Sequence, residues 1–286
     1  MSLIITLNIF SGRPNPVWQL SDKQEALLKE QLDEVKELTA LKSSVVLGRQ
    51  GYRGFTLSSF TNFAQPSLHI HEGIVDSGQL EINRIASNRS IEKFLLETAA
   101  PFLQPNVLEY MQSELVRPIG DLNELISSAQ AGGCPTCYAA DAPVYNPRRW
   151  NIPAVQPYNN CYNYANDQIT NTFAQPGRAS GNYPYPMQCA NVNAAAQSDG
   201  LTNTPNFSGV LAPGQGWYVA LVVWPGTDYH WYRQDNNGCW SHKAGGTAAT
   251  NLDHSGNAIS DPQTCDRGPY TDFCNYMITN RGVVIN

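Results

Sequence analysis

Cysteine is absent from the chain before Cys134, and glutamate is absent after it. All seven cysteines lie from Cys134 onward, together with twelve of the fourteen tyrosines, five of the six tryptophans and one lysine, Lys243. Segments that differ this much in composition are typical of separate folding units, and 286 residues are enough for two domains. We therefore predict a cysteine-free domain over residues 1–130, a linker over residues 131–150 and a second domain over residues 151–286.

The sequence also lacks any run of lysine and arginine, and its net charge at pH 7 is -6. Such a chain has little with which to neutralise a phosphate backbone, so nucleic acid is not an expected partner. No apolar run reaches the roughly 18–20 residues of a membrane span, and the start, MSLIITLNIFSGRPNP, lacks the basic region and cleavage site of a secretory signal. We expect no membrane span, and the oligomeric state is not indicated.

The cysteines that are present favour an oxidising compartment, and so a secreted or cell-envelope protein. Seven is an odd number: if one thiol stays free for chemistry, the other six can form up to three disulfides, and Cys265 with Cys274 is the expected local pair. Cys134 and Cys137 form a CPTC motif, for which we prefer a disulfide role over zinc, because a second cysteine pair at short spacing is missing. A thioredoxin-type site would need a βαβ context. We expect no metal and no cofactor, and the full disulfide connectivity stays open.

Periodicity in the first domain predicts the order β-α-β-β-α, which suits a small α+β sandwich. Ser21 is followed three residues later by Gln24, a capping box that predicts a helix starting at Asp22. The expected elements are strands over residues 3–10, 51–60 and 66–75, helices over 22–38 and 91–103, and helical turns over 105–115 and 121–129. Nothing in this domain is typical of catalysis, so we interpret it as an accessory or pro-domain.

Two patterns resemble metal sites, and we interpret both as structural. His69 and His71 alternate on one face of a predicted strand, but no further cluster in this part of the chain completes a site. Asp253, Asn257 and Asp261 lack the alternating spacing of a dedicated calcium loop, which favours surface turns.

Cys161 lies in the segment YNNCYNYANDQIT, where Asn160 is the expected N-cap of a helix. A thiol in the first turn of a helix is near its positive end and near unpaired N–H groups, which lower the thiol pKa and favour the reactive thiolate. The backbone N–H of Cys161 could also bind an oxyanion. The alternative is a buried or disulfide-bonded cysteine.

Two histidines follow on predicted strands. Apolar runs flank a PGTD turn, and His230 lies at the start of the second run. His242 comes twelve residues later, after an NNG turn, so both rings can lie side by side on adjacent strands. One imidazole would then take the thiol proton while the other orients it.

A cysteine at the start of a helix, followed by these two strand histidines, resembles the NlpC-type cell-wall peptidases, the CHAP amidases and the wider papain-like superfamily. The resemblance covers about residues 155–245 and rests on order and spacing. It implies a helix that carries the nucleophile, packed on an antiparallel sheet, with Cys161 as nucleophile, His230 as general base and His242 as the orienting residue. The expected fold class of the chain is α+β, with a papain-like second domain.

Other roles implied by the resemblance have several candidates. The family's upstream oxyanion helper could be Gln156, Tyr158 or Asn159. If the hairpin register differs, Asp235 or Asn236 could orient His230.

The predicted function is that of a cysteine peptidase or amidase, a hydrolase acting on an amide bond of a peptide or peptidoglycan. Cys161 would attack the carbonyl, and His230 would protonate the leaving amine and then activate water. The alternative is a secreted, disulfide-stapled binding or toxin-like module without catalysis, in which Cys161 and both histidines are structural.

Overall fold

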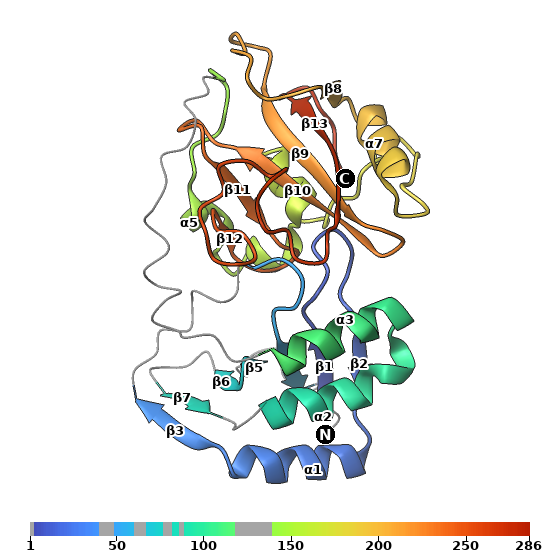
Figure 1. Ribbon diagram of the computed structural model, residues 1–286, viewed down its shortest axis with the longest axis vertical. Coiled ribbons are helices and arrows are strands. Elements are labelled where there is room, and N and C mark those ends of the chain that lie inside the picture. Colours follow the sequence, from blue (N-terminus) through green and yellow to red (C-terminus); the bar gives the residue numbers. More distant parts are fainter. Residues whose placement is uncertain (1–2, 40–48, 60–66, 77–81, 86–88, 118–138) are drawn as a thin grey trace. The chain divides into compact units, whose positions relative to one another are not determined.

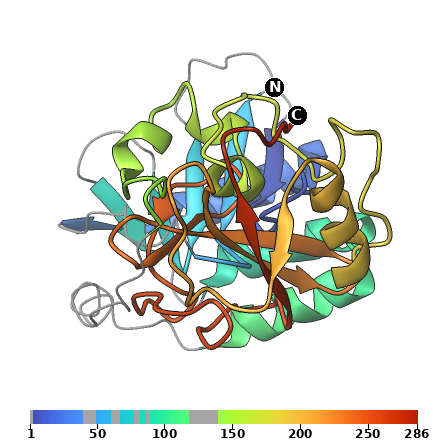
Figure 2. The ribbon, with the colours of Figure 1, turned by 90° about the horizontal axis from the view of Figure 1, so that it is seen from above.

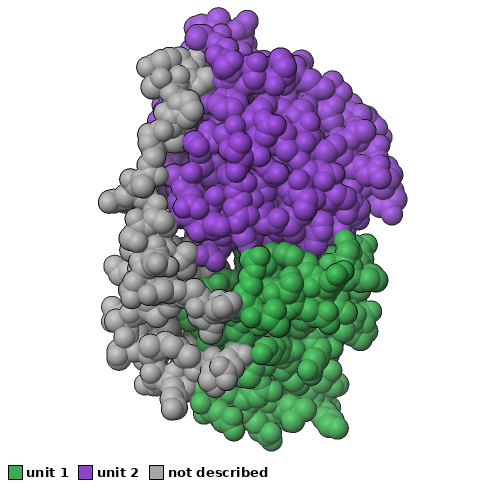
Figure 3. All heavy atoms as spheres, in the orientation of Figure 1, with its two compact units in different colours: residues 1–9, 15–47, 52–122 green, residues 10–14, 48–51, 123–286 purple. Residues whose placement is uncertain are grey.

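The computed structural model describes residues 3–39, 49–59, 67–76, 82–85, 89–117 and 139–286, and these form two compact units. Unit 1 comprises residues 1–9, 15–47 and 52–122, and unit 2 comprises residues 10–14, 48–51 and 123–286 (Figure 3). Two short segments from the N-terminal part of the sequence are therefore counted with unit 2, and composition contains no sign of this. The predicted limits of the two domains and the linker stay a prediction.

Unit 1 is built on a seven-stranded sheet with the strand order β2-β1-β4-β5-β6-β7-β3, in which neighbouring strands are antiparallel (Figure 1). Its strands are β1 (Leu3–Leu7), β2 (Val17–Gln19), β3 (Lys36–Thr39), β4 (Phe55–Ser59), β5 (Leu68–His71), β6 (Ile74–Asp76) and β7 (Ile82–Ile85). Its helices are α1 (Asp22–Asp33), α2 (Ser90–Ala99) and α3 (Pro105–Val116), with a 3-10 turn, η3 (Ala100–Phe102). Helix and sheet in one chain confirm the α+β class.

Local signals explain where several of these elements begin. The Ser21 side chain accepts from the Gln24 N–H, and the Gln24 side chain accepts from the Ser21 N–H, so the predicted capping box is confirmed. The helix ends at Asp33, earlier than predicted, because residues 36–39 pair with β7 as a strand.

The predicted strand over residues 66–75 is a hairpin instead. Glu72 and Gly73 both have positive φ, 51° and 75°, which is the turn that suits the twist of two antiparallel strands. The buried Glu92 carboxylate accepts from the backbone N–H groups of Glu72 at 3.0 Å and Gly73 at 2.7 Å, so helix α2 stabilises this turn. The CPTC motif and the predicted helical turn over 121–129 lie outside the described residues.

Unit 2 contains a six-stranded antiparallel sheet with the order β12-β11-β10-β9-β13-β8. Most of its strands are drawn in orange and red in Figure 2. Its strands are β8 (Thr202–Thr204), β9 (Trp217–Trp224), β10 (Asp228–Gln234), β11 (Trp240–Lys243), β12 (Ala249–Thr250) and β13 (Asp272–Thr279). Its helices are α5 (Pro147–Trp150), α6 (Cys161–Ala165) and α7 (Cys189–Ser198), with a 3-10 turn, η5 (Gln156–Tyr158). The strands predicted around the PGTD turn and after NNG are confirmed as β9, β10 and β11. Every residue of these three strands is buried, which makes them the core of the unit.

The predicted pairing of Cys265 with Cys274 is wrong. Cys274 on β13 forms a disulfide with Cys189, which begins α7, and in Figure 1 this helix lies beside β13. Cys239 is disulfide-bonded as well, and the described part of the chain contains two free thiols, Cys161 and Cys265. Packing of α7 on the sheet decides the partner of Cys274, although 85 residues separate the two cysteines in sequence.

Candidate functional site

Cys161 is the first residue of α6, and Asn160 is its N-cap, as predicted. The Asn160 side chain accepts from the N–H groups of Tyr162 at 3.0 Å and Asn163 at 3.1 Å. The Asn163 side chain in turn accepts from the Asn160 N–H at 3.1 Å, which completes a reciprocal capping box. Short polar side chains three residues apart therefore define where this helix starts.

The thiol itself is not activated. Cys161 is fully buried, and its pKa is raised well above the ordinary value, first by desolvation and second by the negative charge of Asp228. Hydrogen bonds from backbone N–H groups, including that of Trp231, favour the thiolate but are the smaller effect. The predicted low pKa is wrong, because the dipole of a five-residue helix does not offset the burial of an anion in an apolar site.

His230 and His242 lie side by side. The strand register places His242 of β11 opposite Tyr232 of β10, and His230 lies two residues before Tyr232 on the same face of β10. The centroids of the two imidazole rings are 4.8 Å apart, and the ring planes meet at 86°. The ring of His230 also lies 4.8 Å from Tyr232 and 5.6 Å from Tyr270. His242 Nε2 is 2.9 Å from the Leu252 carbonyl oxygen. The pair is therefore surrounded by other rings.

Side chains alternate along β10, and this alternation directs His230 away from helix α6. Trp231 contacts Tyr162 of α6 with centroids 5.4 Å apart, and the Arg233 guanidinium lies 4.1 Å from the ring of Tyr164. His230 and Tyr232 occupy the intervening positions and turn to the opposite face of the sheet. A general base must reach the proton that it removes. The strand instead directs this imidazole to the face away from the helix that carries the thiol.

The candidate oxyanion helpers have structural partners. The Asn159 carboxamide oxygen accepts from the N–H groups of Thr170 at 3.1 Å and Asn171 at 3.0 Å, and its nitrogen donates to the Val155 carbonyl at 2.7 Å. Asn159 is fully buried and serves to order this loop. Gln156 contributes its carbonyl oxygen to a lysine, and Tyr158 is 54% exposed.

The candidate orienting residues also lie elsewhere. Asp235 forms a 2.7 Å ion pair with Arg233, on the face of β10 that packs against α6. Asn236 is exposed in the turn before β11, and its N–H donates to the Pro143 carbonyl at 3.0 Å. Neither residue takes the role predicted for it toward His230.

Buried charges that the sequence did not single out are the main polar feature of unit 2. The Asp167 carboxylate is 4% exposed and binds three arginines: Arg149 at 2.7 Å, Arg281 at 2.9 Å and Arg233 at 3.3 Å. Since these four residues are dispersed in the sequence, no local pattern could have predicted the cluster. A buried carboxylate with this many cationic partners ties several loops to the sheet.

Lys243 is a second buried charge. Its ammonium group donates to the carbonyl oxygens of Gln156 at 2.6 Å and Gly245 at 2.7 Å and to that of Asn159. Three backbone acceptors match the three N–H donors of an ammonium group, so this lysine holds the loop before α6 in place. Lys243 is the only lysine after Cys134, and this isolation is the one feature of the sequence that distinguishes it.

The described residues contain no group of three or more histidine, cysteine, aspartate or glutamate side chains that could hold a metal ion. Asp253 is buried, and its carboxylate accepts from the N–H groups of Asn257 at 2.8 Å and Asp266 at 3.2 Å, so it stabilises a turn rather than lying at the surface. Among the helices that the structure describes, none is long and apolar enough to cross a membrane.

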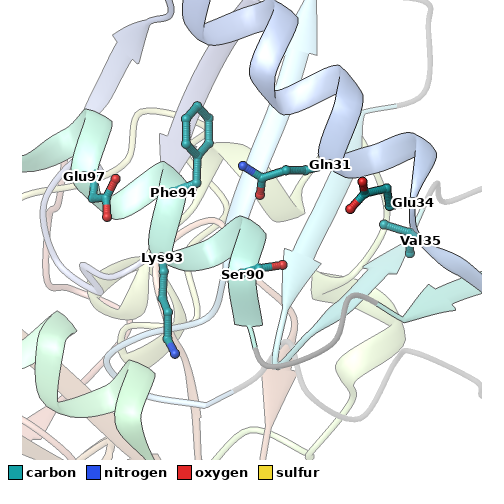
Figure 4. Close-up of a pocket in the computed structure, with 7 residues that line it drawn as sticks. All are labelled: Gln31, Glu34, Val35, Ser90, Lys93, Phe94 and Glu97. Carbon is teal, nitrogen blue, oxygen red and sulfur yellow. The ribbon is translucent and has the colours of Figure 1, made fainter.

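A pocket of about 480 Å³ lies in unit 1, where residues at the end of α1 and along α2 line it (Figure 4). Gln31, Lys93 and Glu97 are among the lining residues. None of the predicted site residues lines this pocket.

Comparison with known proteins gives one informative match. Over 135 residues the chain is 53% identical to insoluble matrix shell protein 1 of Ruditapes philippinarum, and the match covers 46% of this chain and 87% of that protein. This chain belongs to the same family. No protein-family model and no solved structure matches the chain.

Membership in the family of insoluble matrix shell protein 1 overturns the predicted activity. The relative is named as a shell matrix protein and not as a peptidase or amidase. The prediction of a cysteine hydrolase acting on a peptide or peptidoglycan is therefore wrong. The raised pKa of the buried Cys161 thiol agrees with this correction.

Proposed function

We propose that this chain is a secreted structural protein of an extracellular matrix, without catalytic activity. The observation that carries the proposal is the 53% identity to insoluble matrix shell protein 1, of which 87% is covered. The proposal is a form of the alternative that the cysteine content suggested, a disulfide-stapled module without catalysis.

The chemistry of unit 2 supports this proposal. The Cys189–Cys274 disulfide suits an oxidising, extracellular environment. The ion pairs of Asp167 and the carbonyl contacts of Lys243 connect loops to the sheet, which favours durability over motion. The thiol that resembled a nucleophile is buried and protonated.

The proposal includes a papain-like scaffold for unit 2, retained as a stable framework. Support comes from helix α6, which begins at Cys161 and packs against β10 and β11 of an antiparallel sheet. The cysteine and the two histidines then serve as core residues, which accounts for their burial.

Sequential extraction of the tissue that secretes the protein tests the proposal. An antibody against the chain should detect it in extracellular material that resists salt and detergent and dissolves only in denaturant with reductant. Recovery in the first, salt-soluble extract would contradict a matrix role.

An activity assay provides the second test. The purified chain and its Cys161→Ala variant should both release no product from casein or from peptidoglycan. Product release by the native chain that the variant loses would restore the hydrolase interpretation.

A further inference from the structure

The segment Phe10–Pro14 has the contacts of a bound peptide. It is counted with unit 2, although the residues on both sides of it, 1–9 and 15–47, are counted with unit 1. The contacts described below are made to residues 160–270, all of which belong to unit 2.

Asp228, at the start of β10, binds the backbone of the segment. Its buried carboxylate accepts from the N–H groups of Ser11 at 2.6 Å, Gly12 at 3.2 Å and Arg13 at 3.1 Å, and from the Tyr270 hydroxyl at 2.7 Å. Three consecutive N–H groups converging on one carboxylate require a turn in the bound chain. The site therefore selects backbone shape as well as charge.

The carbonyl oxygen of Gly12 is also held by hydrogen bonds from unit 2. Its oxygen accepts from Asn160 Nδ2 at 2.8 Å, Gln175 Nε2 at 2.7 Å and the Tyr229 hydroxyl at 3.0 Å. A Cβ at position 12 would lie 2.4 Å from the Tyr229 ring, which real side chains do not tolerate. The site therefore accepts glycine and excludes larger residues at this position.

The flanking side chains add further recognition. The Arg13 guanidinium donates to the Thr227 carbonyl at 2.8 Å and lies 4.4 Å from the centre of the Phe10 ring. Phe10 in turn contacts Trp224, with ring centroids 6.3 Å apart. The site thus recognises an aromatic residue, a glycine turn and an arginine in sequence.

We propose that this site is a peptide-docking site and that segment 10–14 of a second copy of the chain occupies it during matrix assembly. The inference rests on the proposed matrix function and supplies its assembly step. The contacts are non-covalent and join residues far apart in the sequence, so a neighbouring copy at high local concentration can supply the same segment. Each copy carries one segment and one site, and a head-to-tail contact of this kind extends into open chains.

Complementation between two full-length variants tests the proposal. In Gly12→Ala the segment can no longer bind, but the site is unchanged. In Asp228→Asn the site can no longer bind, because the new amide group places a donor opposite the N–H groups of the segment, but the segment is unchanged. Light scattering after gel filtration should give the monomer mass for each variant alone and the dimer mass for their mixture. No larger species should form, because each pair of chains has only one native segment and one native site. Gly246→Ala is the matched control, since its Cβ would meet only ordinary contacts of 3.4 Å, and it should assemble as the native chain does.

The native chain supplies an independent measurement if either variant fails to fold, as judged by circular dichroism. Its mean mass should rise with concentration beyond that of a dimer, and a synthetic peptide of residues 8–16 should lower that mass, whereas the same peptide with Gly12→Ala should not. A native chain that stays monomeric up to its solubility limit, or a folded mixture no heavier than its components, overturns the docking proposal. If the protein is recovered from the insoluble matrix but the purified chain stays monomeric, the docking proposal is refuted and the proposed matrix function is not.

Discussion

The reactivity of Cys161 distinguishes a structural thiol from a catalytic one. We expect iodoacetamide to leave Cys161 unmodified in the native protein, both near pH 6 and near pH 8. The side chain is fully buried and its pKa is raised, so alkylation requires the protein to open.

The expected slowing of Cys161 alkylation follows from the free energy needed to expose the thiol. If exposure of Cys161 requires unfolding, and unfolding costs at least about 5 kcal/mol, the open fraction is about 10⁻⁴ or less. Alkylation of the native protein should then be about 10⁴-fold slower than that of the same residue in denaturant.

Peptide-level mass spectrometry after timed quenching measures both rates at Cys161. The denatured chain serves as the reference for intrinsic reactivity, and His230→Ala is the diagnostic variant. In our interpretation this variant alkylates no more slowly than the native chain, because the imidazole does not activate the thiol. Rapid modification near pH 6 that His230→Ala slows would refute the argument from burial.

Three further predictions concern stability. Asp167→Asn removes the negative charge that three arginines share, and it should lower the free energy of unfolding, measured in urea, by about 3 kcal/mol or more. The control is Asp272→Asn, on an exposed residue, which should change that free energy by less than about 0.5 kcal/mol. Burial lowers the pKa of His69 from 6.5 to about 4, so the unfolded chain binds the proton first. The contribution of His69 to stability is fully present above pH 6.5 and should fall by about 3 kcal/mol as the pH drops to 4. In urea titrations at several pH values, the native chain should therefore lose about 3 kcal/mol more than His69→Gln over this range; equal losses would contradict the shift. Replacing both Cys189 and Cys274 by alanine releases a loop closed over a separation of 85 residues and should cost about 4 kcal/mol in thermal unfolding; an unchanged midpoint would contradict a stabilising disulfide.

Several features could be predicted because their causes are local. The capping box at Ser21 and the N-cap at Asn160 depend on residues at most three positions apart, and both are present. The antiparallel pairing of β9 with β10 follows from apolar runs around a tight turn, and the adjacency of His230 and His242 follows from the next turn. The end of the helix predicted over residues 22–38 was wrong, because residues 36–39 form a strand that pairs with the distant β7.

The site was predicted as a set of residues but not as a chemical environment. Order and spacing brought Cys161, His230 and His242 together as candidates, and the resemblance to papain-like enzymes rested on the same order. Spacing does not reveal which face of a strand packs against a helix. The contacts of Trp231 and Arg233 with α6 decide that His230 faces the other way.

The amino-acid sequence indicates the contrast in composition between its two parts, the start of α6 at Cys161 and the strands that carry the two histidines. Contacts between distant parts of the chain bury the thiol beside Asp228, pair Cys274 with Cys189 and group segment 10–14 with unit 2. The two sets of features differ in how far apart in sequence the interacting residues lie. Helix caps and tight turns depend on hydrogen bonds among residues a few positions apart, whereas desolvation, disulfide pairing and the binding of a distant segment depend on which parts of the folded chain exclude water together.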